Sequence, residues 1–459
     1  METPLAYIKQ RVDEDWLIGC DRHQLLYLSQ QLCLELSQQS SSTTPPRVLL
    51  AERNPLRFLA GFIAATTAGC PVFLGNPDWV EAEWQQVLNL VQPQLIWGQV
   101  PNSTHFLSPA SPPANTSGLI MIPTGGSSGQ IRFTMHTWET LMASVQGFSE
   151  YFQIPTIHSF CVLPLYHVSG LMQFLRSLTT GGRLVILPFK ALETKPNLQI
   201  QPSEFFISLV PTQLQRLLNF HPLWLAEFKT VLLGGSPAWN ELLEKARFHK
   251  IQLSPTYGMT ETASQIVTLK PADFLQGNNS CGQVLPHAKV TVHNSTGEVL
   301  TANQTGLIAI QADSLCLGYY PHFFSDLSSL QFPTFQPDDL GFFDEQDYLH
   351  IVGRNSNKII TGGENVFPAE VEAAILATQL VKDVCVIGLP DSQWGQIVTA
   401  IYVPSHPQIF PDILQTVLKD KLSKFKQPKS WIPLENLPRN AQGKINFAQL
   451  TEIAILKQK

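Results

Sequence analysis

The 459-residue sequence lacks the features that mark several large classes of protein. Its seven cysteines form no Cys-x-x-Cys pair and no metal-ligand spacing with histidine, so neither a zinc site nor a disulfide framework is indicated. No apolar run approaches about 18 residues, and residues 1–5 carry no basic or apolar signal region. We therefore expect a soluble, cytoplasmic protein without stable membrane insertion, with mostly buried thiols in a reducing compartment.

Charge is also scarce, at 14% of residues against 44% hydrophobic, which is typical of a globular chain of two or three domains. The net charge of −6 argues against nucleic acid as a partner. Residues 354–459 nevertheless carry 12 basic and 9 acidic side chains, so this part is mildly positive. Such an excess suits a small molecule carrying several phosphates, although a solvated mixed surface is the commoner origin.

A glycine-rich stretch after the apolar run 118–122 predicts a flexible loop on a buried strand. Converging backbone N–H groups and hydroxyl donors in such a loop can hold a polyphosphate, while a plain surface connector is the alternative. No Gly-Lys-Ser/Thr closes the loop, which excludes a P-loop nucleotidase. The loop residues are Thr124, Gly125, Gly126, Ser127, Ser128 and Gly129.

Short apolar runs alternate with helix-length segments between residues 47 and 233. This alternation predicts an α/β fold whose large N-terminal domain has mainly parallel sheets flanked by helices, with ligands at the carboxyl ends of the strands. Residues 289–317, rich in Val, Thr, Ile and Gly, predict a small β-barrel-like portion. Predicted helices cover 24–36, 56–68, 81–91, 138–152, 170–178 and 211–218; predicted strands cover 47–51, 70–74, 94–97, 159–163, 183–187, 205–210 and 230–233.

A further unit begins near Arg354, and Pro368 stands where a proline can open the helix 369–376. We expect an N-terminal domain over residues 1–353, a hinge over 354–358 and a small mobile α+β C-terminal domain over 359–459.

Five more stretches carry residues that a nucleotide site would use. They are Pro-Leu-Tyr-His-Val-Ser-Gly (164–170), Gly-Gly-Ser-Pro (234–237), Pro-Thr-Tyr-Gly-Met-Thr-Glu-Thr (255–262), Asp-Asp-Leu-Gly (338–341) leading to Gly-Arg-Asn-Ser (353–356), and Pro-Arg-Asn-Ala-Gln-Gly-Lys-Ile (438–445). In this order with the glycine loop, residues 49–446 resemble the acyl-adenylate-forming ligases, which include acyl-CoA synthetases, adenylation domains of peptide synthetases, and luciferases. Segments 163–170, 210–218 and 362–368 are most similar to the 2-succinylbenzoate-CoA ligases of menaquinone and phylloquinone biosynthesis.

The resemblance implies ATP and Mg²⁺ in the large domain and coenzyme A as co-substrate. The glycine loop would hold phosphates, Thr260 would contact the α-phosphate, and Glu261 would hold Mg²⁺, for which a carboxylate oxygen is a suitable ligand. The remaining ATP contacts implied are Tyr257 stacked on adenine, Gly234, Gly235, Ser236 and Gly258 beside it, and Asp339 and Arg354 on the ribose. Taken alone, residues 338–339 are also compatible with an ordinary turn.

The same resemblance names catalytic residues. Lys444 would bridge the substrate carboxylate and the α-phosphate, since a flexible ammonium needs no fixed geometry, although alone it could be an ordinary exposed lysine. His167 would form a wall between the acid pocket and the thiol path, where a core histidine is the alternative. Gly362 and Gly363 would line the coenzyme A path, and Ser356 would be the hinge residue. Apart from the resemblance, the positive charge of the lysine cluster could attract the coenzyme A phosphates, although a solvated charged face is the commoner origin of such a cluster. The cluster consists of Lys421, Lys424, Lys426 and Lys429.

The sequence departs from the family at two places. Residues 131–133, Ile-Arg-Phe, stand where a Pro-Lys-Gly-like segment usually continues the glycine loop, which leaves the loop geometry open, although Arg132 can replace the lysine charge. Ser356 stands where aspartate or lysine is commoner.

The implied acid, 2-succinylbenzoate, keeps one carboxylate charged inside an apolar pocket, so the pocket needs a cation or several donors. Arg216 on the predicted helix 211–218 is the candidate, with Thr262, Ser264 and Gln265 as further donors; a solvated helix arginine is the alternative. We thus expect ATP-dependent ligation of 2-succinylbenzoate to coenzyme A through an acyl-adenylate. Another aromatic, fatty or amino acid remains open, and so does a catalytically silent nucleotide-binding module, which the presence of Glu261, Asp339 and Lys444 disfavours. The sequence is compatible with a homo-oligomer and does not specify one.

Overall fold

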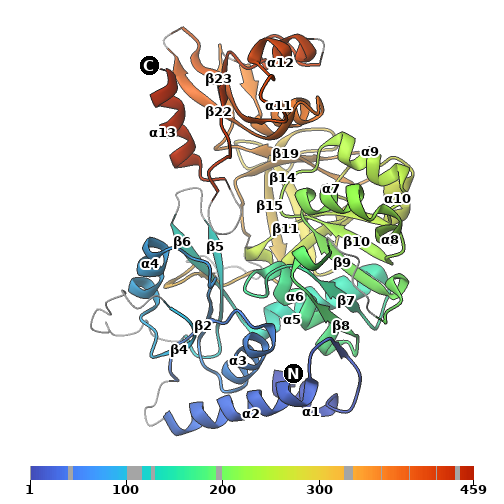
Figure 1. The fold of residues 1–459 in the computed structure, drawn as a ribbon, viewed down its shortest axis with the longest axis vertical. Helices are drawn as coiled ribbons and strands as arrows, with labels where there is room; N and C mark the ends of the chain where they lie inside the picture. The colour runs from blue at the N-terminus through green and yellow to red at the C-terminus, as the bar shows by residue number, and fades with distance from the viewer. Residues whose placement is uncertain are drawn as a thin grey trace.

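The fold is given by a computed structural model that describes residues 2–39, 45–100, 116–125, 130–192, 199–324, 334–362, 364–391, 393–419, 421–439 and 445–458. The C-terminal elements, orange to red, lie at one end of the molecule, and the N-terminal helices α1 (Pro4–Gln10) and α2 (Arg22–Gln39) lie at the other (Figure 1). Within the described residues, no helix is long and apolar enough to cross a membrane.

A seven-stranded sheet contains the strand that leads into the glycine loop. Its order is β17 (His322–Phe323), β16 (Gly318–Tyr319), β6 (Ile131–His136), β5 (Ile120–Gly125), β3 (Val72–Leu74), β2 (Val48–Ala51) and β4 (Leu95–Gly98). Strands β2 to β5 pair in parallel, with α3 (Pro55–Thr67) and α4 (Glu81–Val91) as crossovers, whereas β6, β16 and β17 pair antiparallel. Helix α3 begins where the Asn54 side chain accepts the Arg57 N–H, and a proline occupies the first turn.

An eight-stranded sheet carries most of the remaining motifs. Its order is β1 (Leu17–Ile18), β8 (Leu184–Ile186), β7 (His158–Cys161), β9 (Phe205–Leu209), β10 (Thr230–Leu233), β11 (Leu253–Met259), β12 (Ser264–Thr268) and β13 (Gln283–Val284). Pairing is parallel from β1 to β11 and antiparallel beyond it. The helices along this part of the chain are α5 (Trp138–Phe152), α6 (Val168–Thr179), α7 (Pro211–Phe220), α8 (Pro222–Ala226), α9 (Asn240–Phe248) and α10 (Pro271–Leu275).

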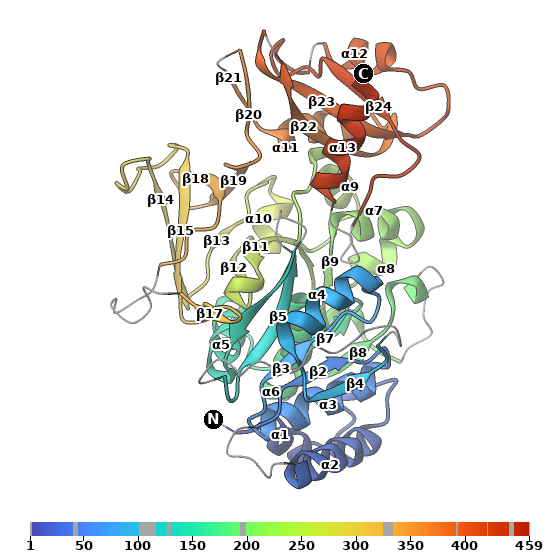
Figure 2. The same cartoon turned by 90° about the vertical axis from the view of Figure 1, so that its left-hand side faces the viewer.

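Two smaller sheets complete the chain. The antiparallel sheet in the predicted barrel-like region has the order β14 (Ala288–His293), β15 (Gly306–Ala312), β18 (Asp339–Phe343) and β19 (Leu349–Arg354). The C-terminal sheet contains β21 (Glu364–Val366), β20 (Ile359–Thr361), β23 (Gly395–Pro404), β22 (Val381–Asp391) and β24 (Ser430–Pro433), with helices α11 (Pro368–Leu376), α12 (Pro411–Leu418) and α13 (Phe447–Gln458). A quarter-turn view separates the C-terminal elements from the two large sheets (Figure 2).

The α/β fold class with a smaller C-terminal domain is therefore confirmed, and the predicted helices and strands of residues 47–233 are present with shifted ends. The strands among them belong to the seven-stranded and the eight-stranded sheets. The strand β6 was missed, because the irregular Ile-Arg-Phe segment was interpreted as a continuation of the loop, and it pairs with β5 as one arm of a hairpin. Strands β18 and β19 extend the antiparallel sheet beyond residue 317, where the prediction stopped.

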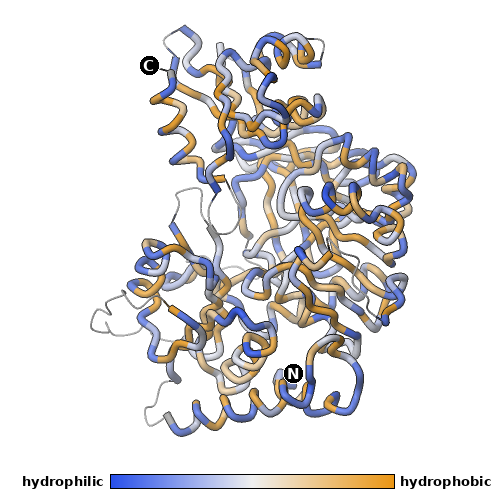
Figure 3. Tube along the Cα trace, in the orientation of Figure 1, coloured by the Kyte–Doolittle hydropathy of each residue, from blue (hydrophilic) through white to orange (hydrophobic). Residues whose placement is uncertain are grey.

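The core lies between the sheets and their helices, where hydrophobic residues concentrate along the central strands (Figure 3). Helix α6 is buried more completely than an ordinary surface helix, since all nine residues from 170 to 178 are buried. Phe62 and Phe174 meet edge to face there, with ring centroids 6.3 Å apart. A polar side chain on such a helix therefore lies inside the molecule.

His136 joins the two large sheets near the motifs. It is fully buried at the end of β6, and its Nε2–H donates to the Thr260 carbonyl over 2.8 Å, because a carbonyl can only accept. Burial lowers the pKa of this imidazole from 6.5 to about 4, so it stays neutral near pH 7.

This shift predicts acid sensitivity of folding. In the unfolded chain this histidine takes up a proton near its ordinary pKa of 6.5, whereas in the folded protein it does so only near pH 4. The free energy of unfolding therefore falls as the pH drops from 6.5 toward 4, and about 2 kcal/mol is lost by pH 5. Urea unfolding at pH 7 and pH 5 measures the loss. His136→Gln should lower stability at pH 7 and show a smaller further loss at pH 5 than the control His23→Gln, whose imidazole is exposed. Equal pH losses in the two variants would contradict the assignment.

Candidate active site

Three predicted ATP-binding residues lie in contact with one another. The Tyr257 hydroxyl on β11 donates to Asp339 Oδ2 over 2.8 Å, and Arg354 Nε lies 3.3 Å from Asp339 Oδ1. The register of β18 and β19 places Asp339 directly opposite Arg354. Asp339 is only 8% exposed, and burial together with this carboxylate raises the pKa of Tyr257, which remains a hydrogen-bond donor. The cluster offers an aromatic ring, a carboxylate and a guanidinium at one place.

Two of the predicted glycines, Gly234 and Gly258, lie where a side chain would collide with neighbouring atoms. A Cβ on Gly234, just after β10, would lie 2.6 Å from Thr256 Oγ1, and one on Gly258 would lie 2.2 Å from the Ser264 carbonyl. Gly235 adopts a φ of +87°, which favours glycine, and Ser236 beside it is exposed. Gly234, Gly235 and Ser236 follow the carboxyl end of the parallel strand β10, where ligands collect in such sheets.

Glu261 lies in the short 3-10 helix η3 (Thr260–Thr262). Its Oε1 accepts a hydrogen bond of 2.6 Å from the Tyr319 hydroxyl, and the Arg132 guanidinium lies 4.5 Å from the Tyr319 ring centroid. Arg132 on β6 is the register partner of Thr124 on β5. The segment that departs from the family thus brings a cation toward the Glu261 carboxylate.

The Glu261 site fits magnesium in one specific way. Among the described residues no group of three or more His, Cys, Asp or Glu side chains gathers, so they form no multi-ligand protein cage. A single buried carboxylate suits Mg²⁺, which commonly keeps its waters and takes its other ligands from substrate phosphates. When bound, the ion would neutralise phosphate charge, and Glu261 would be the residue that holds it here.

His167 occupies the N-cap position of α6, half-buried, with its ring 4.6 Å from the Tyr166 ring. The turn before it is tight, because a Cβ on Gly170 would lie 2.1 Å from the Pro164 carbonyl oxygen. The histidine therefore stands at the start of α6, on the same helix as Arg176.

Arg176, near the other end of α6, is a buried cation that the sequence analysis did not single out. It is 3% exposed, its Nη2 donates to Gln265 Oε1 over 2.9 Å and to Ser264 Oγ over 3.2 Å, and its guanidinium stacks 4.1 Å from the Phe148 ring centroid. Burial lowers the pKa of this group from 12.5 to about 9, so it is still a cation at neutral pH. Ser264 holds a φ of +105°, a strained backbone of the kind found at functional sites.

Several polar atoms on and around this buried cation lack hydrogen-bond partners. Among the described residues no carboxylate lies within ion-pair distance of Arg176, and Arg176 Nε, Gln173 Oε1 and Gln265 Nε2 are buried without a hydrogen-bond partner. Both ring nitrogens of His287 are also unpartnered. Burial is the main cause that lowers the pKa of His287 to about 4, and the nearby Arg176 cation contributes in the same direction. Buried polar atoms are rarely left so, which indicates room for a polar ligand or water.

Two of the predicted acid contacts, Arg216 and Thr262, lie in different surroundings from Arg176. Arg216 is exposed on α7, whereas Arg176 is a buried cation. Thr262 is fully buried, and its hydroxyl bonds the Met259 and Ser264 carbonyls, so it shapes the turn and presents no donor to a ligand. Ser264 does face the guanidinium. One sequence signal for Arg176 exists, since it is the single charged residue between 168 and 182; none indicated Tyr319.

Several predicted residues cannot be placed. Gly126, Ser127, Ser128, Gly129, Gly363 and Lys444 lie outside the described residues. Thr124 and Gly125 end strand β5, which confirms that the glycine loop follows a buried strand. Ser356 lies between β19 and β20, where its N–H donates to Asp338 Oδ2 over 2.8 Å. Gly362 has a φ of +58° and donates its N–H to the Trp394 carbonyl.

The chain matches two family models, that of AMP-binding enzymes over residues 98–320 and that of the AMP-binding enzyme C-terminal domain over residues 370–444. It is 34% identical to the 2-succinylbenzoate-CoA ligase of Listeria monocytogenes, over 72% of this chain and 68% of that one. It is 35% identical to the ligase of the same name from Oceanobacillus iheyensis, over 62% of this chain and 58% of that one. The o-succinylbenzoate CoA synthetase of Bacillus subtilis, solved with its acyl-adenylate intermediate, has a TM-score of 0.85 at 25% identity and 98% coverage of both chains.

The Tyr257–Asp339–Arg354 cluster generates a prediction for nucleotide binding. Asp339→Ala should raise the KM for ATP by about 10- to 150-fold, as for the loss of a hydrogen bond to a charged group worth roughly 1.5–3 kcal/mol, and should leave the KM for the acid nearly unchanged. The control Glu345→Gln changes an exposed carboxylate on the same sheet connection and should have no effect. Steady-state kinetics at varied ATP decide, and an unchanged ATP KM in Asp339→Ala would remove the residue from the nucleotide site.

Proposed function

This chain belongs to the family of AMP-binding enzymes, and we propose that it is an ATP-dependent ligase that joins 2-succinylbenzoate to coenzyme A through an acyl-adenylate. The observation that carries the choice of acid is the buried Arg176, which lacks a carboxylate partner among the described residues. The names of the similar ligases support the same acid.

The acid and the pocket have matching requirements. 2-Succinylbenzoate reacts through its aliphatic carboxylate, so its ring carboxylate must stay bound and charged. Leaving a carboxylate or a guanidinium buried alone costs several kcal/mol, whereas the two together offset each other. An arginine fork grips a carboxylate through two parallel hydrogen bonds. The Ser264 hydroxyl lies beside it, where it accepts from Arg176 Nη2 and donates to Gln265 Oε1.

The spacing of the two subsites also suits a small acid. Ser264 follows Glu261 by three residues, a stretch of chain that spans at most about 11 Å. The ring carboxylate at Arg176 and Ser264 would leave the aliphatic carboxylate toward Glu261 and the phosphate side. His167, at the opposite end of α6, would wall the reacting end of the acid.

The proposed reaction has two steps. An oxygen of the aliphatic carboxylate attacks the α-phosphorus of ATP, and the bond to the bridging oxygen breaks, so that pyrophosphate leaves and the acyl-adenylate forms. The coenzyme A thiol then loses its proton and attacks the acyl carbon, and AMP leaves as the thioester forms. Thr260 and the glycine loop would bind phosphate oxygens, and Lys444 would neutralise charge between carboxylate and α-phosphate in the first step.

The C-terminal domain would supply the thiol side. We propose the boundaries 1–353, 354–358 and 359–459, with motion about Ser356, which lies between two separate sheets. Gly362 packs on Trp394, whose indole is 41% exposed and has Lys429 Nζ 3.2 Å from its ring centroid. This exposed ring with its cation would receive the nucleotide end of coenzyme A. We place the reaction in the cytoplasm, which agrees with seven free cysteines.

The proposal is tested by pyrophosphate release across a panel of carboxylic acids. We expect release that requires ATP, Mg²⁺ and 2-succinylbenzoate, with little from octanoate or benzoate. If another acid is turned over and 2-succinylbenzoate is not, the assignment of the acid is wrong and the assignment as a ligase stands. No release with any acid would favour a silent nucleotide-binding module.

Arg176 and Arg216 form a matched pair for testing the pocket. Arg176→Met should lower kcat/KM for 2-succinylbenzoate by about 10- to 150-fold, or roughly 1.5–3 kcal/mol, because the ring carboxylate loses its partner, while the KM for ATP stays within twofold. Arg216→Ala should behave as wild type, since that side chain is exposed. Wild-type efficiency in Arg176→Met, or an equal loss in both variants, would contradict the placement.

Trp394 provides a separate test of the thiol side. Trp394→Ala should raise the KM for coenzyme A about 5- to 100-fold, as for a lost base–aromatic stacking contact of roughly 1–3 kcal/mol, without changing acid-dependent pyrophosphate release. Phe410→Ala, which removes an exposed aromatic ring from the same domain, is the control. If Trp394→Ala keeps the wild-type KM for coenzyme A, the coenzyme does not bind at this ring.

A further inference from the structure

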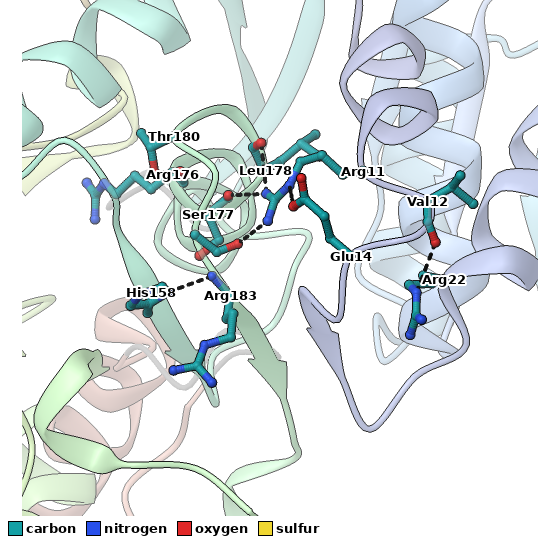
Figure 4. A network of polar contacts seen from close by, with 11 residues as sticks. Arg11, Val12, Glu14, Arg22, His158, Arg176, Ser177, Leu178, Thr180 and Arg183 are labelled. Atoms are coloured by element: carbon teal, nitrogen blue, oxygen red, sulfur yellow. Dashed lines mark hydrogen bonds and ion pairs between the residues drawn. The ribbon is translucent and has the colours of Figure 1, made fainter.

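The N-terminal segment, residues 4–22, is hydrogen-bonded to the end of helix α6 through one arginine. Arg11, which caps α1 and is 6% exposed, donates from Nη1 to the Ser177 carbonyl over 2.8 Å and to the Leu178 carbonyl over 3.1 Å (Figure 4). Its Nη2 donates to the Gly182 carbonyl over 2.8 Å. One guanidinium thus holds three carbonyls in the last turn of α6 and the loop after it.

The end of α6 needs such donors. The last four carbonyls of a helix lack partners within the helix, and a cation is favoured there by the helix dipole. The Thr180 N–H bonds the Arg176 carbonyl and the Gly182 N–H bonds the Ser177 carbonyl, while Arg11 bonds Ser177 and Leu178. The turn is crowded, since a Cβ on Gly182 would lie 1.8 Å from the Ile157 carbonyl oxygen.

Arg11 is itself fixed in place. Its Nε donates to Glu14 over 2.7 Å, and its guanidinium lies 5.0 Å from the Trp16 ring centroid. The chain then continues into β1, where Leu17 pairs with Leu184 of β8 at the edge of the eight-stranded sheet. The N-terminal segment is therefore anchored to the sheet on one side and to α6 on the other.

We propose that Arg11 is a positioning residue for Arg176 and so sets the discrimination between acids with and without the ring carboxylate. The inference rests on the proposed function. Arg176 immediately precedes the first carbonyl that Arg11 grips, while His167 lies about 14 Å away along the helix axis, at the end fixed by the Gly170 turn. Loosening the last turn displaces Arg176 and leaves His167 and the nucleotide residues in place.

The experiment compares two acids in two variants. Wild type, Arg11→Met and Arg11→Lys are assayed with 2-succinylbenzoate and with benzoylpropanoate, the same acid without the ring carboxylate, and the ratio of the two kcat/KM values is the readout. This ratio does not depend on how much of the enzyme is folded. We expect Arg11→Met to lower it at least about tenfold, as for lost bonds to a charged donor, with an unchanged KM for ATP. Arg11→Lys should fall between, because one ammonium cannot serve three carbonyls in a fixed fork.

Arg22→Met is the matched control. Arg22 lies in the same segment, and its Nε donates to the Val12 carbonyl within that segment (Figure 4), so this variant should keep the wild-type ratio. If the ratio of the two kcat/KM values in Arg11→Met stays within twofold of wild type, the inference is overturned. If Arg11→Met does not fold, the same criterion applies to Arg11→Lys. A wild-type enzyme that does not itself discriminate between the two acids would instead overturn the proposed binding of the ring carboxylate at Arg176.

Discussion

A guanidinium buried on a helix interior constrains this structure more than any other single group. Arg176 is almost inaccessible, stacks on Phe148, and bonds only neutral side chains among the described residues. A buried cation without an anion is unfavourable by several kcal/mol, and so is the ring carboxylate of the proposed acid taken alone. In the proposed complex, binding the acid would satisfy both groups, which would make the site selective for a dicarboxylate.

The fold places the residues that we assign to the acid and to the nucleotide on short connections. Strand β11 carries Tyr257, η3 carries Glu261, and β12 begins at Ser264, so one continuous stretch would present the adenine, metal and acid sides in order. Helix α6, with His167 at one end and Arg176 near the other, would span the acid side. His136, neutral because it is buried, ties this stretch to the seven-stranded sheet that carries the glycine loop.

Sequence periodicity predicted the crossover elements well, because helices such as α3 and α5 and the buried strands between them follow local patterns of burial and capping. Motif resemblance predicted that Tyr257, Asp339 and Arg354 belong together, and the register of β18 and β19 brings them into contact. The predicted acid cation, Arg216, is exposed, and our proposal assigns that role to the buried Arg176 instead. Arg176 and Arg216 both sit on helices after a strand, and which one is buried depends on the packing of α6 between other elements, which neither periodicity nor propensity contains. Strand β6 was missed for a similar reason, since its pairing partner defines it.

Measuring the coupling between Arg176 and the ring carboxylate tests the account most directly. Stable analogues of the acyl-adenylate, with and without the ring carboxylate, are titrated into wild type and Arg176→Met in a double-mutant cycle. The account predicts that removing the carboxylate weakens binding to wild type by at least about tenfold and has little effect on the variant, a coupling of roughly 1.5–3 kcal/mol. Additive effects of the two changes, with no coupling, would show that the ring carboxylate does not meet Arg176.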